Sequence, residues 1–221
     1  KSGLVSWGSA EFIAAEEMGR SRGFWWAPDG ESLLVARVDV EHLCEWWLSA
    51  PVDPAAVPRS IRYPAAGTEN ASVDLMVVDR AGERQHVDWR RDEFEYLTSV
   101  SWSRDSFDSA SPTLVVQTRD QKTLVVLKVD ITTGITDEVY RLEDDYWVEL
   151  VSGVPRWWQG RLLTVEDRGD TRRLCLDGRA FSPDDVQVRR VVGVDGDGVV
   201  AMVSTNPVDI EVSRLSLDGS V

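Results

Sequence analysis

Basic side chains are scarce in this 221-residue sequence. It has 24 Lys and Arg against 38 Asp and Glu, which gives a formal net charge of −14. Nucleic-acid binding requires clustered Lys and Arg that contact phosphates, so the composition argues against a nucleic-acid partner, and an anionic membrane surface is disfavoured for the same reason. The acidic balance is compatible with cationic ligands such as the amino terminus of a peptide.

Histidine and cysteine are also scarce. His42 and His86 stand apart from each other, and Cys44 and Cys175 are widely separated, so no metal-ligand spacing occurs. We therefore expect no metal ion and no cofactor. Buried cysteines in a reducing compartment usually stay free, and we expect two buried free thiols, with a disulfide as the open alternative.

Several sequence signals are missing altogether. No run approaches the roughly 18 apolar residues of a membrane span, no signal peptide is visible, and the chain starts at Lys1, so we expect a fragment of a longer polypeptide. The sequence has no Gly-x-Ser-x-Gly elbow, phosphate-binding loop or dinucleotide fingerprint. The acidic segment 195–198 lacks the other ligand positions of a calcium loop, and we interpret it as a hairpin turn.

Short strand patterns separated by turn residues fill most of the chain. Hydrophobic residues make up 43% of the sequence and ten are Trp, which indicates a folded core. Four-strand units recur at roughly 35 to 50 residues, a pattern typical of β-propeller blades. We therefore predict an all-β fold, a partial β-propeller of about four four-stranded blades forming one fragment over residues 1–221, with a β-sandwich as the alternative. The predicted strands lie at 23–27, 32–38, 61–64, 73–79, 85–89, 97–103, 113–118, 123–130, 136–140, 153–158, 161–166, 172–178, 178–181, 188–194, 199–204 and 210–217, with another strand allowed at 46–48.

One helical pattern interrupts the strands, at residues 9–18. Ser9 is the expected N-cap and Gly19 the expected end of the helix. Glu16 and Glu17 lie near its end. Two adjacent carboxylates repel each other unless a cation lies between them, and a primary ammonium with three donors suits that arrangement. The alternative is a solvated pair, or one neutralised by Arg20 and Arg22.

The tryptophans favour a packing role. Trp25-Trp26 and Trp157-Trp158 each open a predicted blade, and adjacent strand residues face opposite sides of a sheet. Core packing is therefore preferred over ligand contact for these pairs and for the other Trp residues.

Three motifs resemble the dipeptidyl peptidase IV family of serine peptidases, most closely its cytosolic and bacterial branch. The first is Phe12-Ile13-Ala14-Ala15-Glu16-Glu17-Met18-Gly19-Arg20 followed by Gly23-Phe24-Trp25-Trp26-Ala27-Pro28-Asp29-Gly30. The second, from Tyr63 to Val73, is similar to the family's Tyr-Pro-x-Ala-Gly-x-x-Asn-x-x-Val segment, and the third is Tyr146-Trp147-Val148. Together they span about residues 9–158, and the last sixty residues match in strand pattern only.

The resemblance implies the amino-terminal propeller of an enzyme that releases dipeptides after Pro or Ala. By position, Glu16 and Glu17 match the paired glutamates that hold the ammonium of the substrate. No catalytic residue is expected in this chain, because the family's triad belongs to a carboxy-terminal α/β-hydrolase domain, which would be its partner. The resemblance also implies a cytoplasmic location and allows a homodimer of the parent protein. Glu149-Leu150-Val151 stands where some members have a Phe-Arg pair, so the match does not extend to that feature. The competing hypothesis is a non-catalytic propeller that binds other proteins.

Overall fold

The computed structural model describes residues 3–102 and 111–217, and the chain divides into two compact units. The first unit comprises the described residues up to 148, and the second comprises 149–217. Strands dominate both units, and the described residues contain one helix, α1 (Phe12–Glu17). The all-β prediction is confirmed, while the prediction of a single fragment over 1–221 stays a prediction.

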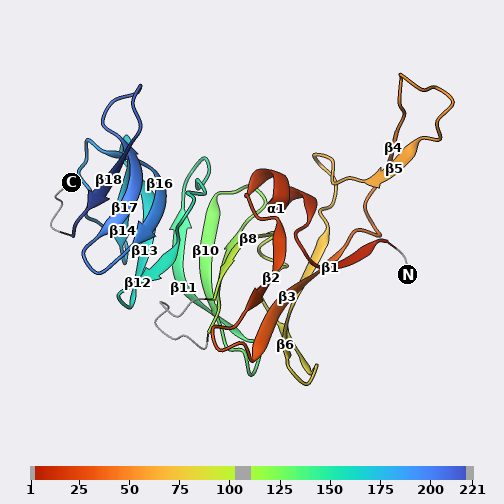
Figure 1. Cartoon of the computed structure of the whole chain (residues 1–221), viewed down its shortest axis with the longest axis horizontal. Coiled ribbons are helices and arrows are strands. Elements are labelled where there is room, and N and C mark those ends of the chain that lie inside the picture. The colour runs from red at the N-terminus through yellow and green to blue at the C-terminus, as the bar shows by residue number, and fades with distance from the viewer. Residues whose placement is uncertain (1–2, 103–110, 218–221) are drawn as a thin grey trace. The chain divides into compact units, whose positions relative to one another are not determined.

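The first sheet of the amino-terminal unit has the strand order β1-β2-β3-β6-β7 (Figure 1). β1 and β2 follow one another along the same edge of β3: Val5–Trp7 pair with one end of it and Phe24–Trp26 with the other. The five strands therefore make four rows, as expected for a blade, and α1 is inserted between the two halves of the first row. The strands are β1 (Val5–Ser9), β2 (Arg22–Trp26), β3 (Ser32–Asp39), β6 (Ser72–Asp79) and β7 (Arg84–Val87).

A two-stranded ribbon separates β3 from β6. It consists of β4 (Glu45–Leu48) and β5 (Arg59–Arg62), and all four residues of β4 are exposed. β5 overlaps the strand predicted at 61–64, and it pairs with β4 rather than with β6. β6 has no free edge at which β5 could pair, because it lies between β3 and β7.

The second sheet of this unit has the order β11-β10-β9-β8 and confirms the predicted four-strand block. Its strands are β8 (Tyr96–Ser101), β9 (Thr113–Gln117), β10 (Thr123–Val129) and β11 (Thr136–Glu143), and the predicted end of the first of them, Ser103, lies outside the described residues. Apolar side chains from both sheets form one core, since neither sheet could bury its face alone. Its largest fully buried members are Trp89, Phe94, Leu34, Leu75, Leu97, Leu114 and Leu127.

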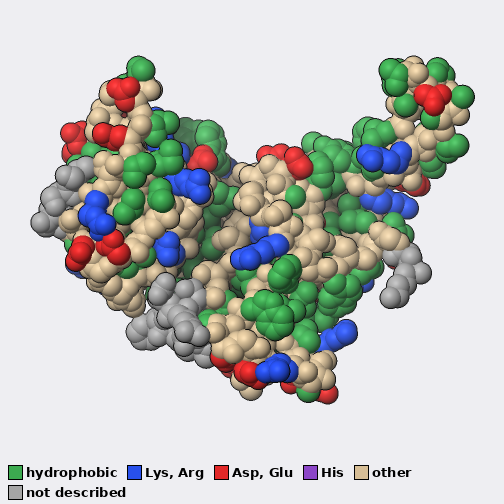
Figure 2. Space-filling view, in the orientation of Figure 1, with side chains coloured by type: hydrophobic (Ala, Val, Ile, Leu, Met, Phe, Trp, Pro, Cys, Tyr) green, Lys and Arg blue, Asp and Glu red, His purple; other side chains and the backbone are tan. Residues whose placement is uncertain are grey.

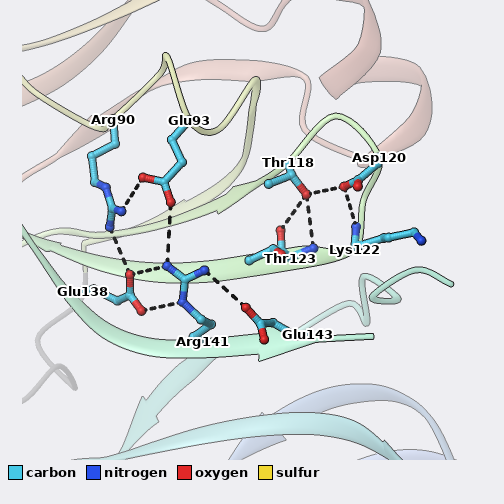
Figure 3. Close-up of polar contacts among 9 residues, drawn as sticks. All are labelled: Arg90, Glu93, Thr118, Asp120, Lys122, Thr123, Glu138, Arg141 and Glu143. Atoms are coloured by element: carbon cyan, nitrogen blue, oxygen red, sulfur yellow. Dashed lines mark hydrogen bonds and ion pairs between the residues drawn. The ribbon is translucent and has the colours of Figure 1, made fainter. Parts of the chain in front are cut away.

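Two sets of polar contacts join these sheets. The amide of Asp88, just after β7, donates to the carbonyl of Gly134 in the β10–β11 turn at 2.8 Å. Nearby, Arg90 lies between Glu93 and Glu138, and Glu138 accepts two hydrogen bonds of 2.8 Å from Arg141 on its own strand, as Figure 3 shows. These Arg141 hydrogen bonds are the main reason why the pKa of Glu138 lies below its ordinary value. The charges of Glu93 and Glu138 are thus balanced by the two guanidinium groups of Arg90 and Arg141.

The second unit contains a four-stranded sheet, β12-β13-β14-β15, and a three-stranded sheet, β16-β17-β18. The first confirms the predicted third block; in the last block the described residues supply three strands rather than four. The segment Asp195–Gly198 makes the predicted turn between β16 and β17, with the Asp195 amide donating to the Gly198 carbonyl at 3.1 Å. The strands are β12 (Arg156–Trp158), β13 (Arg161–Arg168), β14 (Thr171–Leu176), β15 (Arg179–Ala180), β16 (Gln187–Val194), β17 (Val199–Ser204) and β18 (Glu211–Leu215).

The tryptophan prediction is right for one member of each pair. Trp25 and Trp158 are buried, whereas Trp26 is exposed and Trp157 is partly buried, because neighbouring strand residues face opposite sides. Trp89 is also in the core, where its indole donates to the carbonyl of Val73 at 3.2 Å. The prediction is wrong for four exposed tryptophans, namely Trp7, Trp46, Trp47 and Trp147.

Candidate functional site

Helix α1 begins at a different residue from the one predicted. Ser9 belongs to β1 and pairs with Arg22, so it is not the N-cap. The N-cap is Glu11, whose carboxylate accepts hydrogen bonds from the amides of Ile13 at 2.5 Å and Ala14 at 2.8 Å. The two carboxylate oxygens of Glu11 cap two amides at once. The usual N-cap preferences, which favour Ser, Thr, Asp and Asn, do not predict a Glu at this position.

The helix ends where the sequence predicts. Gly19 has a φ of +65°, the left-handed conformation that favours glycine after a helix. The amides of Met18 and Arg20 both donate to the carbonyl of Ala14, at 3.3 and 2.9 Å, and close the last turn. Gly23 then lets the chain return beside β1, since a Cβ there would lie 2.3 Å from the carbonyl oxygen of Ser9.

Glu16 and Glu17 are the last two residues of α1, and both are exposed. Figure 2 shows acidic side chains on the surface where Figure 1 labels α1. The last turn of the helix carries no basic residue. Within residues 3–102 and 111–217, neither carboxylate forms an ion pair or a side-chain hydrogen bond. The alternative in which Arg20 and Arg22 neutralise the pair is therefore not what the structure shows.

The electrostatics of this helix end favour a cation. Two carboxylates lie next to each other, and the carbonyl groups at the end of a helix add partial negative charge. Arg20, the nearest basic residue in sequence, is buried and pairs with Glu11 instead, with its Nη2 3.8 Å from Oε1. The arrangement can therefore accept hydrogen bonds from a cationic donor such as a primary ammonium.

The first turn of α1 carries one member of an aromatic cluster. Phe12 is one helical turn before Glu16 and is 44% exposed. Its ring makes an edge-to-face contact with Tyr63, at a centroid distance of 5.1 Å, and Tyr63 makes a second such contact with Trp46 at 5.9 Å. The first and second sequence motifs thus meet in space, a contact that their separation in sequence does not predict.

A polar cavity of about 570 Å³ lies at the other end of the second motif. The amide of Asn70 donates to Glu95 at 2.8 Å, and Glu95 also pairs with Arg119 at 3.1 Å. His42 contacts the carbonyl of Asn70 at 2.8 Å. These partners give Asn70 a structural role in joining the segment before β6 to that before β8.

The remaining predictions on sites concern metals, membranes and thiols. In the described ranges, no group of His, Cys, Asp and Glu could hold a metal ion, and no helix is long and apolar enough to cross a membrane. Both cysteines are free. Cys175 is buried, and burial raises the pKa of its thiol to about 11. Cys44 is exposed, so the expectation of two buried thiols is wrong for this residue, which leads into the exposed β4.

Successive antiparallel sheets, three of them with four rows and the last with three among the described residues, define the class of protein, a partial β-propeller. Residues 2–188 match the family model described as "Dipeptidyl peptidase IV (DPP IV) N-terminal region". This match covers most of the chain, so the chain belongs to that family, and the resemblance inferred from the sequence is confirmed.

Individual relatives include proteins with contrasting names. "Inactive dipeptidyl peptidase 10" of Rattus norvegicus is 29% identical over 157 residues, which is 67% of this chain and 19% of the relative. "Probable dipeptidyl-aminopeptidase B" of Ajellomyces capsulatus is 26% identical over 204 residues, 84% of this chain and 20% of the relative. The chain therefore spans about a fifth of the length of these curated relatives.

A solved structure supports the fold assignment. Dipeptidyl peptidase 4 of Porphyromonas gingivalis superimposes with a TM-score of 0.84 at 17% sequence identity, covering 98% of this chain and 32% of that protein. At this identity the likeness shows the fold alone. Together with the sheet order it confirms the prediction of a partial β-propeller.

Proposed function

We propose that this chain is the propeller part of a serine dipeptidyl peptidase, in which Glu16 and Glu17 bind the ammonium group of the substrate's amino terminus. One observation carries the proposal: in a member of this family, two adjacent exposed carboxylates end a helix whose last turn has no basic residue. The peptide bond would be cleaved by a carboxy-terminal α/β-hydrolase domain outside this chain, after a second residue that is Pro or Ala.

The carboxylate pair would determine where cleavage occurs. An ammonium held at a fixed place leaves room for two residues before the scissile bond, and a longer amino-terminal extension would collide with α1. Hydrogen bonds to charged groups contribute about 1.5–3 kcal/mol, equivalent to roughly 10- to 150-fold in affinity. Removing one carboxylate should therefore weaken substrate binding severely without altering the cleavage chemistry.

The test uses the full-length protein and a chromogenic Ala-Pro substrate. Glu16→Gln and Glu17→Gln each keep the size of the side chain but remove its charge, and each should lower kcat/KM by about 10- to 100-fold, mainly through KM. A substrate analogue without the amino group should be hydrolysed slowly but equally by the wild-type and variant proteins, because it lacks the cation that the pair would bind.

Glu83→Gln provides a matched control. Glu83 is exposed in the β6–β7 turn, so its substitution makes the same charge change away from α1. It should leave kcat/KM for Ala-Pro within about twofold of the wild-type value, since exposed charges contribute little at a distance. Equal kcat/KM in wild type, Glu16→Gln and Glu17→Gln would refute the role of the pair.

A non-catalytic propeller is the second candidate function. It is favoured by the match to relatives named "Inactive dipeptidyl peptidase 10". The two candidates differ in the reading frame downstream of this chain, because the peptidase requires a Gly-x-Ser-x-Gly elbow there. A frame without that elbow would exclude the peptidase and leave Glu16 and Glu17 as a solvated helix end.

A further inference from the structure

Arg20 lies beneath the helix that carries the carboxylate pair. Arg20 is only 8% exposed. Nε donates to the carbonyl of Leu97 on β8 at 3.1 Å, and Nη1 donates to the carbonyl of Arg22 on β2 at 3.2 Å. The guanidinium also lies over the ring of Trp25, 5.9 Å from its centroid. One side chain thus connects the segment after α1 to both sheets of the amino-terminal unit.

Glu11 holds the other end of the helix. It is also 8% exposed, and both of its carboxylate oxygens accept hydrogen bonds from amides of the first turn. Its Oε1 lies 3.8 Å from Nη2 of Arg20, and this Nη2 is buried without a hydrogen-bond partner among the described residues. The residue before α1 and a residue just after it therefore meet as a buried pair of opposite charges.

Such a pair is costly and must be well placed. Burial is the main cause that raises the pKa of Glu11 and lowers the pKa of Arg20, because it disfavours both charged forms. Each charge therefore depends on the other and on the polar backbone groups around it. Removing one partner of a buried pair leaves an uncompensated charge, which makes the surrounding segment rearrange. Because α1 has only six residues, its orientation depends on these end contacts more than on its own backbone hydrogen bonds.

We propose that Glu11 and Arg20 are positioning residues that fix the orientation of α1, so that Glu16 and Glu17 face the substrate's ammonium together. Neither residue of the buried pair touches the substrate. The inference rests on the proposed function of Glu16 and Glu17, and it assigns to the two buried residues a role in substrate affinity. A misplacement of about 1 Å can reduce a rate 100-fold, so a small rotation of α1 is sufficient for a large effect.

The experiment compares Arg20→Met, Arg20→Lys and Glu11→Gln in the full-length protein. For each, KM and kcat are measured with the Ala-Pro substrate and with its analogue lacking the amine, and active enzyme is counted by titration with a fluorophosphonate. Arg20→Met should raise KM for the amine substrate about tenfold, with kcat within about twofold and the analogue unaffected. Arg20→Lys keeps the charge and should restore part of the affinity. Glu11→Gln should change KM in the same direction as Arg20→Met.

Arg173→Met is the matched control for a general loss of stability. Arg173 in β14 is partly buried, donates to the carbonyl of Ser182 and has a buried Nε without a hydrogen-bond partner among the described residues. It belongs to the second unit, whereas α1 belongs to the first. Its substitution should lower the fraction of active enzyme while KM for both substrates stays at the wild-type value.

The outcomes separate this inference from the proposed function. If Glu16→Gln raises KM for the amine substrate but Arg20→Met and Glu11→Gln do not, the positioning role is refuted and the proposed function stands. An equal loss on both substrates with KM unchanged also refutes positioning, because it indicates a purely structural role. If Glu16→Gln has no effect, or the wild-type protein releases no dipeptide, the proposed function fails and the positioning role fails with it.

Discussion

Gly134 in the β10–β11 turn is the position at which a single methyl group should do most damage to the amino-terminal unit. Its φ is +75°, and a Cβ would lie 1.8 Å from the carbonyl oxygen of His86 and 2.8 Å from the side-chain nitrogen of Gln85. Its carbonyl accepts the 2.8 Å hydrogen bond from Asp88 that joins the first sheet to the second. Gly134→Ala therefore strains the backbone and separates two sheets at once.

The magnitude follows from two contributions. A left-handed conformation costs a residue with a Cβ about 1–2 kcal/mol. The contact at 1.8 Å must open to at least ordinary van der Waals distance, which breaks the hydrogen bond from Asp88 and adds about 1 kcal/mol. We expect a loss of about 2–3 kcal/mol in the local free energy of opening, concentrated in the strands on either side of the contact.

Native-state hydrogen exchange measures this loss, because it reports opening free energies segment by segment. Peptides covering β7 and the β10–β11 turn should exchange much faster in Gly134→Ala than in wild type. Gly82→Ala is the control: Gly82 has a φ of +88° with nothing within 4 Å of its Cβ, so it isolates the conformational cost of about 1–2 kcal/mol. Equal effects of the two substitutions would refute the claim that the close approach of His86 matters.

Two further predictions concern titratable side chains. Cys44 is exposed while burial raises the pKa of the Cys175 thiol to about 11, so iodoacetamide at pH 8 should alkylate Cys44 in the native chain and Cys175 only after denaturation, as mass spectrometry would show; equal labelling would contradict the burial of Cys175. The ion pair with Arg214 and the amides of the β16–β17 turn lower the pKa of Asp195 from 3.8 to about 2. The contribution of ionised Asp195 to the stability of the fold is therefore complete above about pH 4 and is lost as the pH falls through about 2. Carboxyl NMR titration should give that midpoint, and Arg214→Met should raise it, whereas an unchanged midpoint would show that the ion pair does not cause the shift.

The order of local elements could be predicted from the sequence to a large extent. Turn residues such as Pro28-Asp29-Gly30 and the acidic Asp195–Gly198 segment lie where hairpins form, because turn conformations depend mainly on the residues within the turn. The alternation of the strand at Val73–Asp79 also matches its burial, since every second strand residue faces the core. The motif around Glu16 and Glu17 identifies the family for the same reason: it is contiguous.

The tertiary structure decided which partners these residues have. Arg20 bonds to Leu97, 77 positions away, and pairs with Glu11 rather than with the adjacent glutamates. β5 pairs with β4, whereas both edges of β6 are occupied by β3 and β7, and Trp46 and Trp47 of β4 are exposed. Periodicity and turn conformation depend on a few neighbouring residues, so they can be predicted from the sequence. Burial and charge pairing depend on which distant segments compete for the same surface, and this only the folded chain determines.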